Sequence, residues 1–389
     1  MWLKMLCCNS ELSIVTNTEK SFTVVMRGPS AIVFSQNESL TMDLKDSPLG
    51  PLTATYATRW LKKDDEVVVP GQLCIEIKGT GNSLEEVLIK YANSALIPIP
   101  LLALATNAAV EDLEIELGFE TTLNVAEREY FQSYVPQESG IVYLGRHINI
   151  ATTVDLINAV NNNPNQERLM RATSQYLLAL SSWKLGKESM SLAHLWMALE
   201  ALTKAVISSE FVKRDCKTQA DLADLLGVEL KQLDATIRKK FILKDDEDCY
   251  KKAKEASDGL EHGFLGYDKI RDSAKDVRHR MAGYIRVAII ELSGASEQSI
   301  ATLMAEPFDK PMGRWPIAKY LRGHLLGGNS ESLALKGNAY PFMRWNPIIQ
   351  SCAPSKDGKL NFQFTENMTV ELGDGVSFRP QSFEAWQPD

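Results

Sequence analysis

The segment Tyr250–Leu292 most strongly limits what this chain can fold into. It contains the end of one helix, a turn at His262-Gly263 and a second, long helix. At about 100° per residue, the apolar residues from Ile270 to Leu292 fall on one stripe of that second helix. Because such a stripe is stable only when other elements cover it, the segment predicts a helix packed inside a larger helical assembly.

The charged residues of this second helix fall on different sides of it. Arg271 and Arg278 border the apolar stripe, whereas His279 and Arg286 are expected on the opposite side. His262 is the histidine that lies at a structured turn, and acidic residues precede it in the chain. The turn is therefore the first place to look for chemistry, while His279 is interpreted as a solvated surface residue.

The region before this segment is also helical as far back as a polar run, NNNPNQ, at residues 161–166. Apolar residues recur at helical spacing in four stretches, and short loops join them. Helices of this length with short connections favour an antiparallel bundle. The predicted helices are Glu167–Leu185, Glu188–Ile207, Ala220–Leu226 and Leu230–Lys240.

The N-terminal region is predicted to be α+β, with a mixed or antiparallel sheet. Short β-branched and aromatic runs alternate with turn signals at Gly28-Pro29 and Pro70-Gly71. Ser83 is a plausible N-cap for a helix from Leu84 to about Leu96. The predicted strands are Leu12–Thr16, Phe22–Met26, Ala31–Phe34, Val67–Val69, Leu73–Ile77, Asp112–Leu123, Arg128–Tyr134 and Gly145–Ile150, followed by a helix at Thr153–Val160.

An uncharged stretch from Tyr91 to Val110 raises the alternative of a membrane span. It contains Pro98 and Pro100, and no cluster of Lys or Arg flanks it. These features favour a buried, broken helix. The fold prediction is then an α+β N-terminal domain (residues 1–160), an all-α antiparallel helical bundle (166–295) and a small C-terminal extension with some β-structure (296–389), including a helix within Phe308–Leu326.

Composition excludes several functional classes. The net charge of −8 provides no global basic field that would recruit nucleic acid. The six cysteines form no CxxC pair, which argues against a zinc site, and their scattered positions fit a reducing cytoplasm. The sequence lacks the GxxxxGK[ST], GxGxxG, HExxH and GxSxG motifs. We therefore expect no metal, no cofactor and no membrane insertion.

Two stretches together carry a family resemblance. Ser257, Asp258 and His262 stand just before the final helix, and MSLAHLWMALEALTKAV (Met190–Val206) places Glu200 in an earlier helix. This arrangement resembles the HEPN superfamily, most closely its bacterial Apea-like branch and uncharacterised proteins of the methylamine-utilisation J type. The resemblance covers Glu167 to Leu292 and implies a HEPN-like bundle.

The resemblance also implies a function. HEPN ribonucleases cut RNA without a metal, using an Arg to hold phosphate and a His as acid–base group, and they work as dimers. It implies catalytic roles for His262, Asp258 and Glu200 and phosphate contacts for Arg271 and Arg278. The implied setting is stress or phage defence in a bacterial cytoplasm. The implied partners are RNA or a nucleotide, a second copy bound through the bundle, and a partner protein from the same operon.

The chain departs from the family pattern where Ser257 occupies the position expected for Arg. The rival hypothesis is a non-catalytic interaction or sensor protein, in which His262-Gly263 is only a helix C-cap and Glu200 bonds between helices. Geometry separates the two hypotheses. Catalysis requires an exposed His262 in a cleft with an arginine within reach, whereas the structural reading requires a capped helix end.

Overall fold

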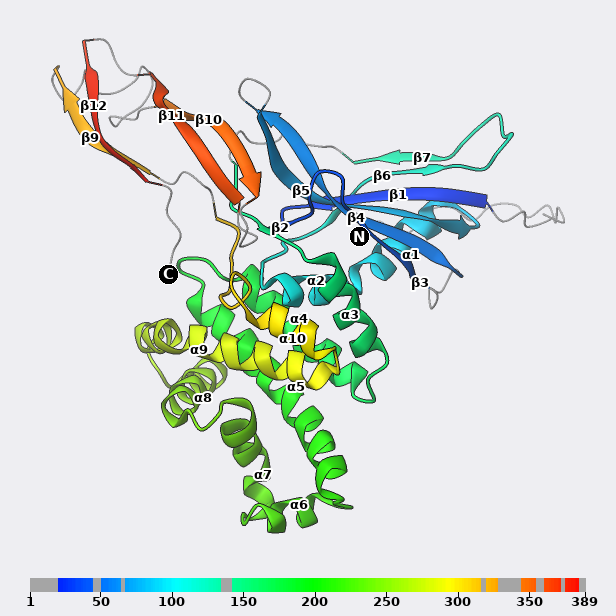
Figure 1. The fold of residues 1–389 in the computed structure, drawn as a ribbon, viewed down its shortest axis with the longest axis vertical. Coiled ribbons are helices and arrows are strands. Elements are labelled where there is room, and N and C mark those ends of the chain that lie inside the picture. The colour runs from blue at the N-terminus through cyan, green and yellow to red at the C-terminus, as the bar shows by residue number, and fades with distance from the viewer. Residues whose placement is uncertain are drawn as a thin grey trace.

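The computed structural model describes residues 20–44, 50–63, 67–133, 142–315, 320–327, 344–354, 360–371 and 375–384. A sheet-rich N-terminal part precedes a mostly helical part, and two antiparallel strand pairs follow near the C-terminal end (Figure 1). This confirms, at a coarse level, the predicted order of an α+β region followed by helices. The predicted strand Leu12–Thr16 lies outside the described residues.

The N-terminal sheet is antiparallel, with the strand order β3-β4-β5-β1-β6-β7. Alternate residues of β1, such as Phe22, Val24 and Met26, are buried on one face, as the two-residue period of a strand requires. A separate pair, β2 with β8, is parallel. The strands are β1 Lys20–Gly28, β2 Ile32–Val33, β3 Leu40–Leu44, β4 Leu52–Lys63, β5 Val67–Gly81, β6 Glu114–Glu120, β7 Tyr130–Gln132 and β8 Arg146–His147.

The predicted turn at Pro70-Gly71 is wrong, because β5 runs through it as one strand. Pro70 pairs with Trp60 of β4, where the register between the two strands shifts between Thr58 and Trp60. A bulge of this kind tolerates a proline that cannot donate to the ladder. The sequence analysis did not predict β4 itself, although its buried residues Leu52, Ala54 and Tyr56 alternate regularly with less buried ones.

One helix packs against the six-stranded sheet, the next packs mainly against the helical part, and the junction between the two confirms the predicted broken helix. The hydroxyl oxygen of Ser83 accepts a hydrogen bond from the Glu86 N–H and begins α1 (Leu84–Leu96), as predicted. Pro98 begins α2 (Ile99–Thr106), in which every residue is buried. Among the described residues, Leu84–Thr106 and Glu188–Arg214 have the length and composition of a membrane span. In the apolar 18-residue window of each segment, 67% and 61% is buried within the protein, so packing inside the protein accounts for their apolar character.

The helical part confirms the apolar stripe of the long helix α9. Ile270, Ala274, Val277, Met281 and Ile285 are buried, and α9 packs against α5 and α8. The helices are α3 Ile150–Asn161, α4 Gln166–Ser181, α5 Glu188–Arg214, α6 Gln219–Leu225, α7 Leu233–Thr236, α8 Glu247–His262, α9 Tyr267–Ser293 and α10 Glu297–Met304, with a 3₁₀ turn η1 at Leu230–Gln232 and a π-helical turn η2 at Ile237–Ile242.

The C-terminal end of α2 joins the two parts of the molecule. Arg286 of α9 donates from Nε to the Leu104 carbonyl (2.9 Å), from Nη2 to Ala105 (3.1 Å) and from Nη1 to Leu303 (2.8 Å). Arg146 donates from Nη1 to the Thr106 carbonyl at 2.7 Å. The last carbonyls of a helix have no partner within it, and here two buried guanidiniums supply the donors. The side of α9 opposite the apolar stripe is thus buried as well.

Asn107 ends α2 at the same junction. Its φ of +49° is in the left-handed region, its carboxamide oxygen accepts from the Tyr176 hydroxyl at 2.7 Å, and its nitrogen donates to the Phe308 carbonyl at 2.9 Å. One side chain therefore connects α2, α4 and the segment after α10. The buried apolar residues form one continuous cluster from Phe22 to Trp315.

We predict that Asn107→Ala lowers the free energy of unfolding by about 2–4 kcal/mol, because a buried hydroxyl and a buried carbonyl lose their partners. Asn107→Gly should lose about 1 kcal/mol less than Asn107→Ala, because glycine tolerates the left-handed backbone. Urea denaturation followed by circular dichroism measures both. Equal losses for the two variants would contradict the backbone part of this account.

Within its described residues, the C-terminal region contains two antiparallel strand pairs, of which only the second is a hairpin of consecutive strands. β9 (Tyr320–Leu326) pairs with β12 (Ser377–Glu384), and β10 (Arg344–Pro354) pairs with β11 (Leu360–Glu371). The first of these strands contradicts the predicted helix over the end of Phe308–Leu326. β10 lies beside β5, but the β10–β11 hairpin is a separate sheet from the N-terminal one (Figure 1).

Candidate functional site

His262 has the geometry of a helix end. It is the last residue of α8 and is exposed, and Gly263 follows with a φ of +67°. The Gly263 N–H donates to the Gly259 carbonyl at 3.0 Å, which closes the helix. The structural reading of this turn, a C-cap with glycine in the left-handed region, is confirmed.

The other two predicted catalytic residues are engaged elsewhere. Asp258 forms an ion pair with Lys254, one turn earlier in α8. Glu200 on α5 is exposed and lies 3.5 Å from Nη2 of Arg238, whose guanidinium stacks 5.5 Å above the ring of Trp196. Glu200 therefore forms an interhelical ion pair, as one reading of the sequence expected.

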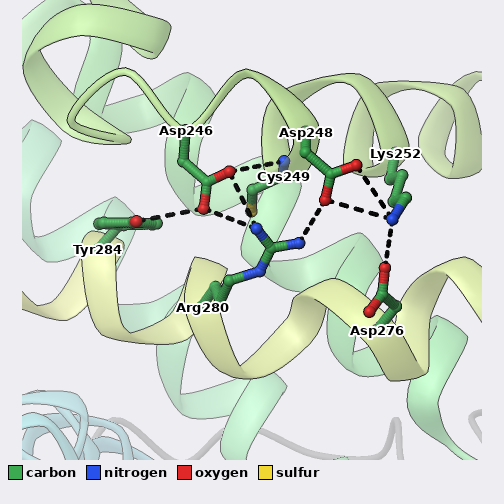
Figure 2. A network of polar contacts seen from close by, with 7 residues as sticks. All are labelled: Asp246, Asp248, Cys249, Lys252, Asp276, Arg280 and Tyr284. Carbon is green, nitrogen blue, oxygen red and sulfur yellow. Dashed lines mark hydrogen bonds and ion pairs between the residues drawn. The ribbon is translucent and has the colours of Figure 1, made fainter.

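Contacts between α8 and α9 show how far His262 lies from Arg278. Arg280 pairs with Asp248, and Lys252 pairs with Asp276, so Arg278 is level with Tyr250 on the neighbouring helix (Figure 2). His262 is three to four helical turns farther along α8, about 18 Å at 1.5 Å per residue. The antiparallel register therefore separates the implied phosphate contact at Arg278 from His262.

Arg271 is nearer the turn, but two acids hold it. Its Nη2 lies 3.1 Å from Asp268 and its Nε lies 3.9 Å from Asp272. These acids compete with any anion for the guanidinium. Ion pairs therefore hold Asp258, Glu200 and Arg271, and none of these ion pairs involves His262.

Figure 2 shows that the space between α8 and α9 is occupied by a polar network. Arg280 donates from Nη1 to both carboxylate oxygens of Asp246 at 2.9 Å and from Nη2 to Asp248 at 2.6 Å. Asp246 also accepts from the Cys249 N–H at 3.0 Å, and so caps α8, and from the Tyr284 hydroxyl at 3.2 Å. Each charged group in it has an opposite partner, so the network fixes the two helices rather than offering a binding site.

This network predicts a pH dependence. Hydrogen bonds from Arg280 and Lys252 hold the pKa of Asp248 below its usual value. Because the folded-state pKa is the lower one, the stabilisation is present above about pH 4 and is lost as the pH falls through the folded-state pKa. The midpoint of urea unfolding should therefore be higher for the wild type than for Asp248→Asn at pH 7. The two midpoints should converge once the pH falls below the folded-state pKa of Asp248, and a constant gap would contradict this assignment.

Arg278 has a different environment from its neighbour Arg280. Its side chain points to the turn between α4 and α5, where its guanidinium lies 4.7 Å above the ring of Trp183. The residue is only 8% exposed, yet its Nε and Nη1 have no hydrogen-bond partner among the described residues. A buried guanidinium with unpaired donors is costly, so it is a candidate for contacting a ligand.

His279 completes this cluster. Its ring lies edge-on to Trp183 with 4.9 Å between the centroids, and the residue is exposed. Trp183 is itself almost fully buried, and the backbone at Gly313 packs so closely against the Trp183 carbonyl that a Cβ at Gly313 would lie 2.2 Å from it. A rigid tryptophan therefore positions an arginine and a histidine that are adjacent in the chain.

The charges around Trp183 are mixed but mainly positive. Burial lowers the pKa of Arg278, and the nearby Glu188 opposes that shift. Burial disfavours the ionised form of Glu188, but backbone N–H groups of Glu188 and Gly186, together with Arg278 and Lys275, hold its pKa below the usual value. Lys275 is exposed one turn before Arg278 and His279 on α9. We refer to Trp183, Lys275, Arg278 and His279 as the Trp183 cluster.

Sequence reasoning identified Arg278 but missed Trp183 and His279. Helical periodicity places Arg278 and His279 on neighbouring sides of α9, but it cannot show which residue of another helix lies between them. The signal that the sequence offered was Trp183 itself, a large aromatic residue near the end of the helix that precedes α5. Among the described residues, no group of three His, Cys, Asp or Glu side chains could hold a metal ion.

A scan of protein-family models and searches of curated proteins and of solved structures found no match to this chain.

Proposed function

We propose that the helical part of this protein binds RNA or a nucleotide phosphate at the Trp183 cluster, as a HEPN-type protein would. The observation that carries the proposal is the Arg278 guanidinium, which is held over Trp183 with two N–H-bearing nitrogens unpaired among the described residues. Guanidinium groups recognise phosphate through paired N–H donors, and Lys275 adds a second positive charge nearby. The exposed ring of His279 offers a face of the kind on which nucleic-acid bases stack, while the buried Trp183 holds His279 and Arg278 in place.

The same arrangement supports metal-independent RNA cleavage. Imidazole exchanges protons near neutral pH, so His279 can accept the proton of a 2′-hydroxyl or donate one to the leaving 5′-oxygen. Attack of the 2′-oxygen on the adjacent phosphorus breaks the bond to the 5′-oxygen and leaves a 2′,3′-cyclic phosphate. Arg278 would stabilise the negative charge on the phosphoryl oxygens. His279 takes the acid–base role that the resemblance implied for His262.

Salt dependence of RNA binding tests the proposal. The logarithm of the affinity for a short single-stranded RNA should fall with the logarithm of salt concentration by about 0.7 for each phosphate contact. Lys275→Gln should reduce that slope by about 0.7. Lys269→Gln removes an exposed lysine from another side of α9 and should leave the slope unchanged. Fluorescence anisotropy measures both, and an equal effect of the two variants would argue against a site at the Trp183 cluster.

A second candidate function is interaction with a protein, and the α8–α9 turn favours it. Leu260, Phe264 and Tyr267 expose 40%, 62% and 59% of their surfaces around the capped helix end. Apolar side chains gathered at one turn are typical of an interface. In this candidate function two copies of the bundle meet at the turn in the cytoplasm. Sedimentation of the wild type and Phe264→Ser tests it, since an interface there predicts a dimer that Phe264→Ser weakens.

A further inference from the structure

A cavity of about 640 Å³ lies between the N-terminal sheet and the helices. Its lining comes from the edge strand β3, from α1 and the start of α2, and from α3 and α4. In Figure 1 these elements converge on the side of the molecule where α1 and α3 approach β3. Its volume lies within the range of small-molecule sites, which form preferentially between structural units.

The deep part of the cavity is apolar. Leu101 and Ile157 are each 2% exposed and form its rigid floor. Met42 and Met170 are half-buried and line it from the sheet and from α4. Methionine adapts its shape to a ligand, and its sulfur makes favourable contacts with aromatic rings. A flat, unsaturated ring suits such a lining.

The polar groups of the cavity are mostly uncharged. Three carboxamides, Asn93, Asn161 and Gln166, line it, and each can donate and accept hydrogen bonds. Ser94 is 5% exposed, and its hydroxyl adds one more group in the lining that can donate and accept a hydrogen bond.

Two charged residues in the lining do not favour an anion. Lys90 is already paired with Glu86 on α1, and Asp43 of β3 adds a carboxylate. Asp43 accepts from the Thr53 hydroxyl at 3.1 Å. The cavity therefore has no net positive charge to attract a phosphate, in contrast to the Trp183 cluster.

From these observations we infer that the cavity is a second site, for an uncharged molecule with a flat heteroaromatic ring, such as a nucleoside. The ring lies between the methionines on the apolar floor, and its polar edge bonds the carboxamides and the Ser94 hydroxyl. Because the lining belongs to both the sheet and the helices, occupancy stabilises their contact. This inference goes beyond the proposed function and does not depend on RNA binding.

Titration calorimetry with adenosine and uridine tests the inference on the full chain. At least one nucleoside should bind the wild type, and Asn161→Trp, which places an indole in the cavity, should weaken that binding at least about ten-fold. Asn162→Trp changes the next exposed residue, which does not line the cavity, and should bind like the wild type. Thermal unfolding confirms that both variants fold before they are compared.

Two further binding measurements distinguish this site from the Trp183 cluster and from a phosphate site. Arg278→Met should bind the nucleoside as the wild type does, and adenosine 5′-monophosphate should bind no more tightly than adenosine. The inference is overturned if neither nucleoside binds the folded wild type at millimolar concentration. It is also overturned if Asn161→Trp leaves the affinity unchanged, if Arg278→Met abolishes binding, or if the monophosphate binds more tightly.

Discussion

Arg286→Met should lower the free energy of unfolding by about 3–5 kcal/mol, the largest stability effect we expect from a single substitution in this chain. Methionine retains the length and apolar stem of the side chain but none of its donors. The buried carbonyls of Leu104, Ala105 and Leu303 would then lose the hydrogen bonds that Arg286 supplies. The Leu104 carbonyl keeps a hydrogen bond from the Asn107 N–H at 3.3 Å, but an unsatisfied buried acceptor retains its full desolvation cost, and Ala105 and Leu303 would each contribute one.

Arg271→Met is the matched control for that substitution. Arg271 lies on the same helix, but its side chain is 38% exposed and its partners are surface acids. Removing an ion pair of this kind should change the free energy of unfolding by about 0–1 kcal/mol. Urea denaturation of the two variants gives the comparison. Similar small losses for both would contradict the role of Arg286 as the donor that caps α2.

Arg278→Met is the second large prediction, and its effect should fall on binding rather than on stability. Arg278→Met removes no hydrogen bond of Nε or Nη1, and the desolvation cost of the buried charge disappears, which offsets the lost attraction to the buried Glu188. We therefore expect the free energy of unfolding to stay within about 1 kcal/mol of the wild type, or to rise. Affinity for single-stranded RNA should fall at least about ten-fold, since a charged hydrogen bond contributes about 1.5–3 kcal/mol.

Arg280→Met, two residues along the same helix, provides the contrast. Arg280 bonds both Asp246 and Asp248, so its loss should lower stability while RNA affinity changes little. Anisotropy and urea denaturation on the same preparations measure both quantities. If Arg278→Met retained RNA affinity, or if it destabilised the protein as much as Arg286→Met, the guanidinium would have a structural role only.

Local patterns in the sequence predicted the local features of the fold. The Ser83 N-cap, the helix break at Pro98, the apolar stripe of α9 and the glycine cap after His262 each follow from a few neighbouring residues. Each also depends on backbone chemistry that the residue types determine by themselves. These features were therefore predictable from one sequence.

Features that depend on distant partners were not predictable in this way. Periodicity placed Arg286 opposite the apolar stripe. The carbonyls that accept its hydrogen bonds belong to a helix some 180 residues earlier in the chain. β5 continues through Pro70 because its partner strand contains an irregularity. The antiparallel register of α8 and α9 separates His262 from Arg278. Trp183, in the turn between α4 and α5, contacts both Arg278 and His279 and so joins them in one cluster. Each of these contacts joins residues that are distant in the chain, so the sequence around one partner does not indicate the other.

Cleavage of a mixed tRNA and mRNA pool in the presence of EDTA tests the central claim most directly, with the wild type, His279→Ala and His262→Ala compared at equal folded concentration. The location of the site at the Trp183 cluster predicts 2′,3′-cyclic phosphate ends from the wild type, loss of cutting in His279→Ala and retained cutting in His262→Ala. Cutting that disappears with His262→Ala and survives His279→Ala would contradict it and return the chemistry to the α8–α9 turn. A folded wild type that neither cuts nor binds RNA would refute the HEPN-type function itself.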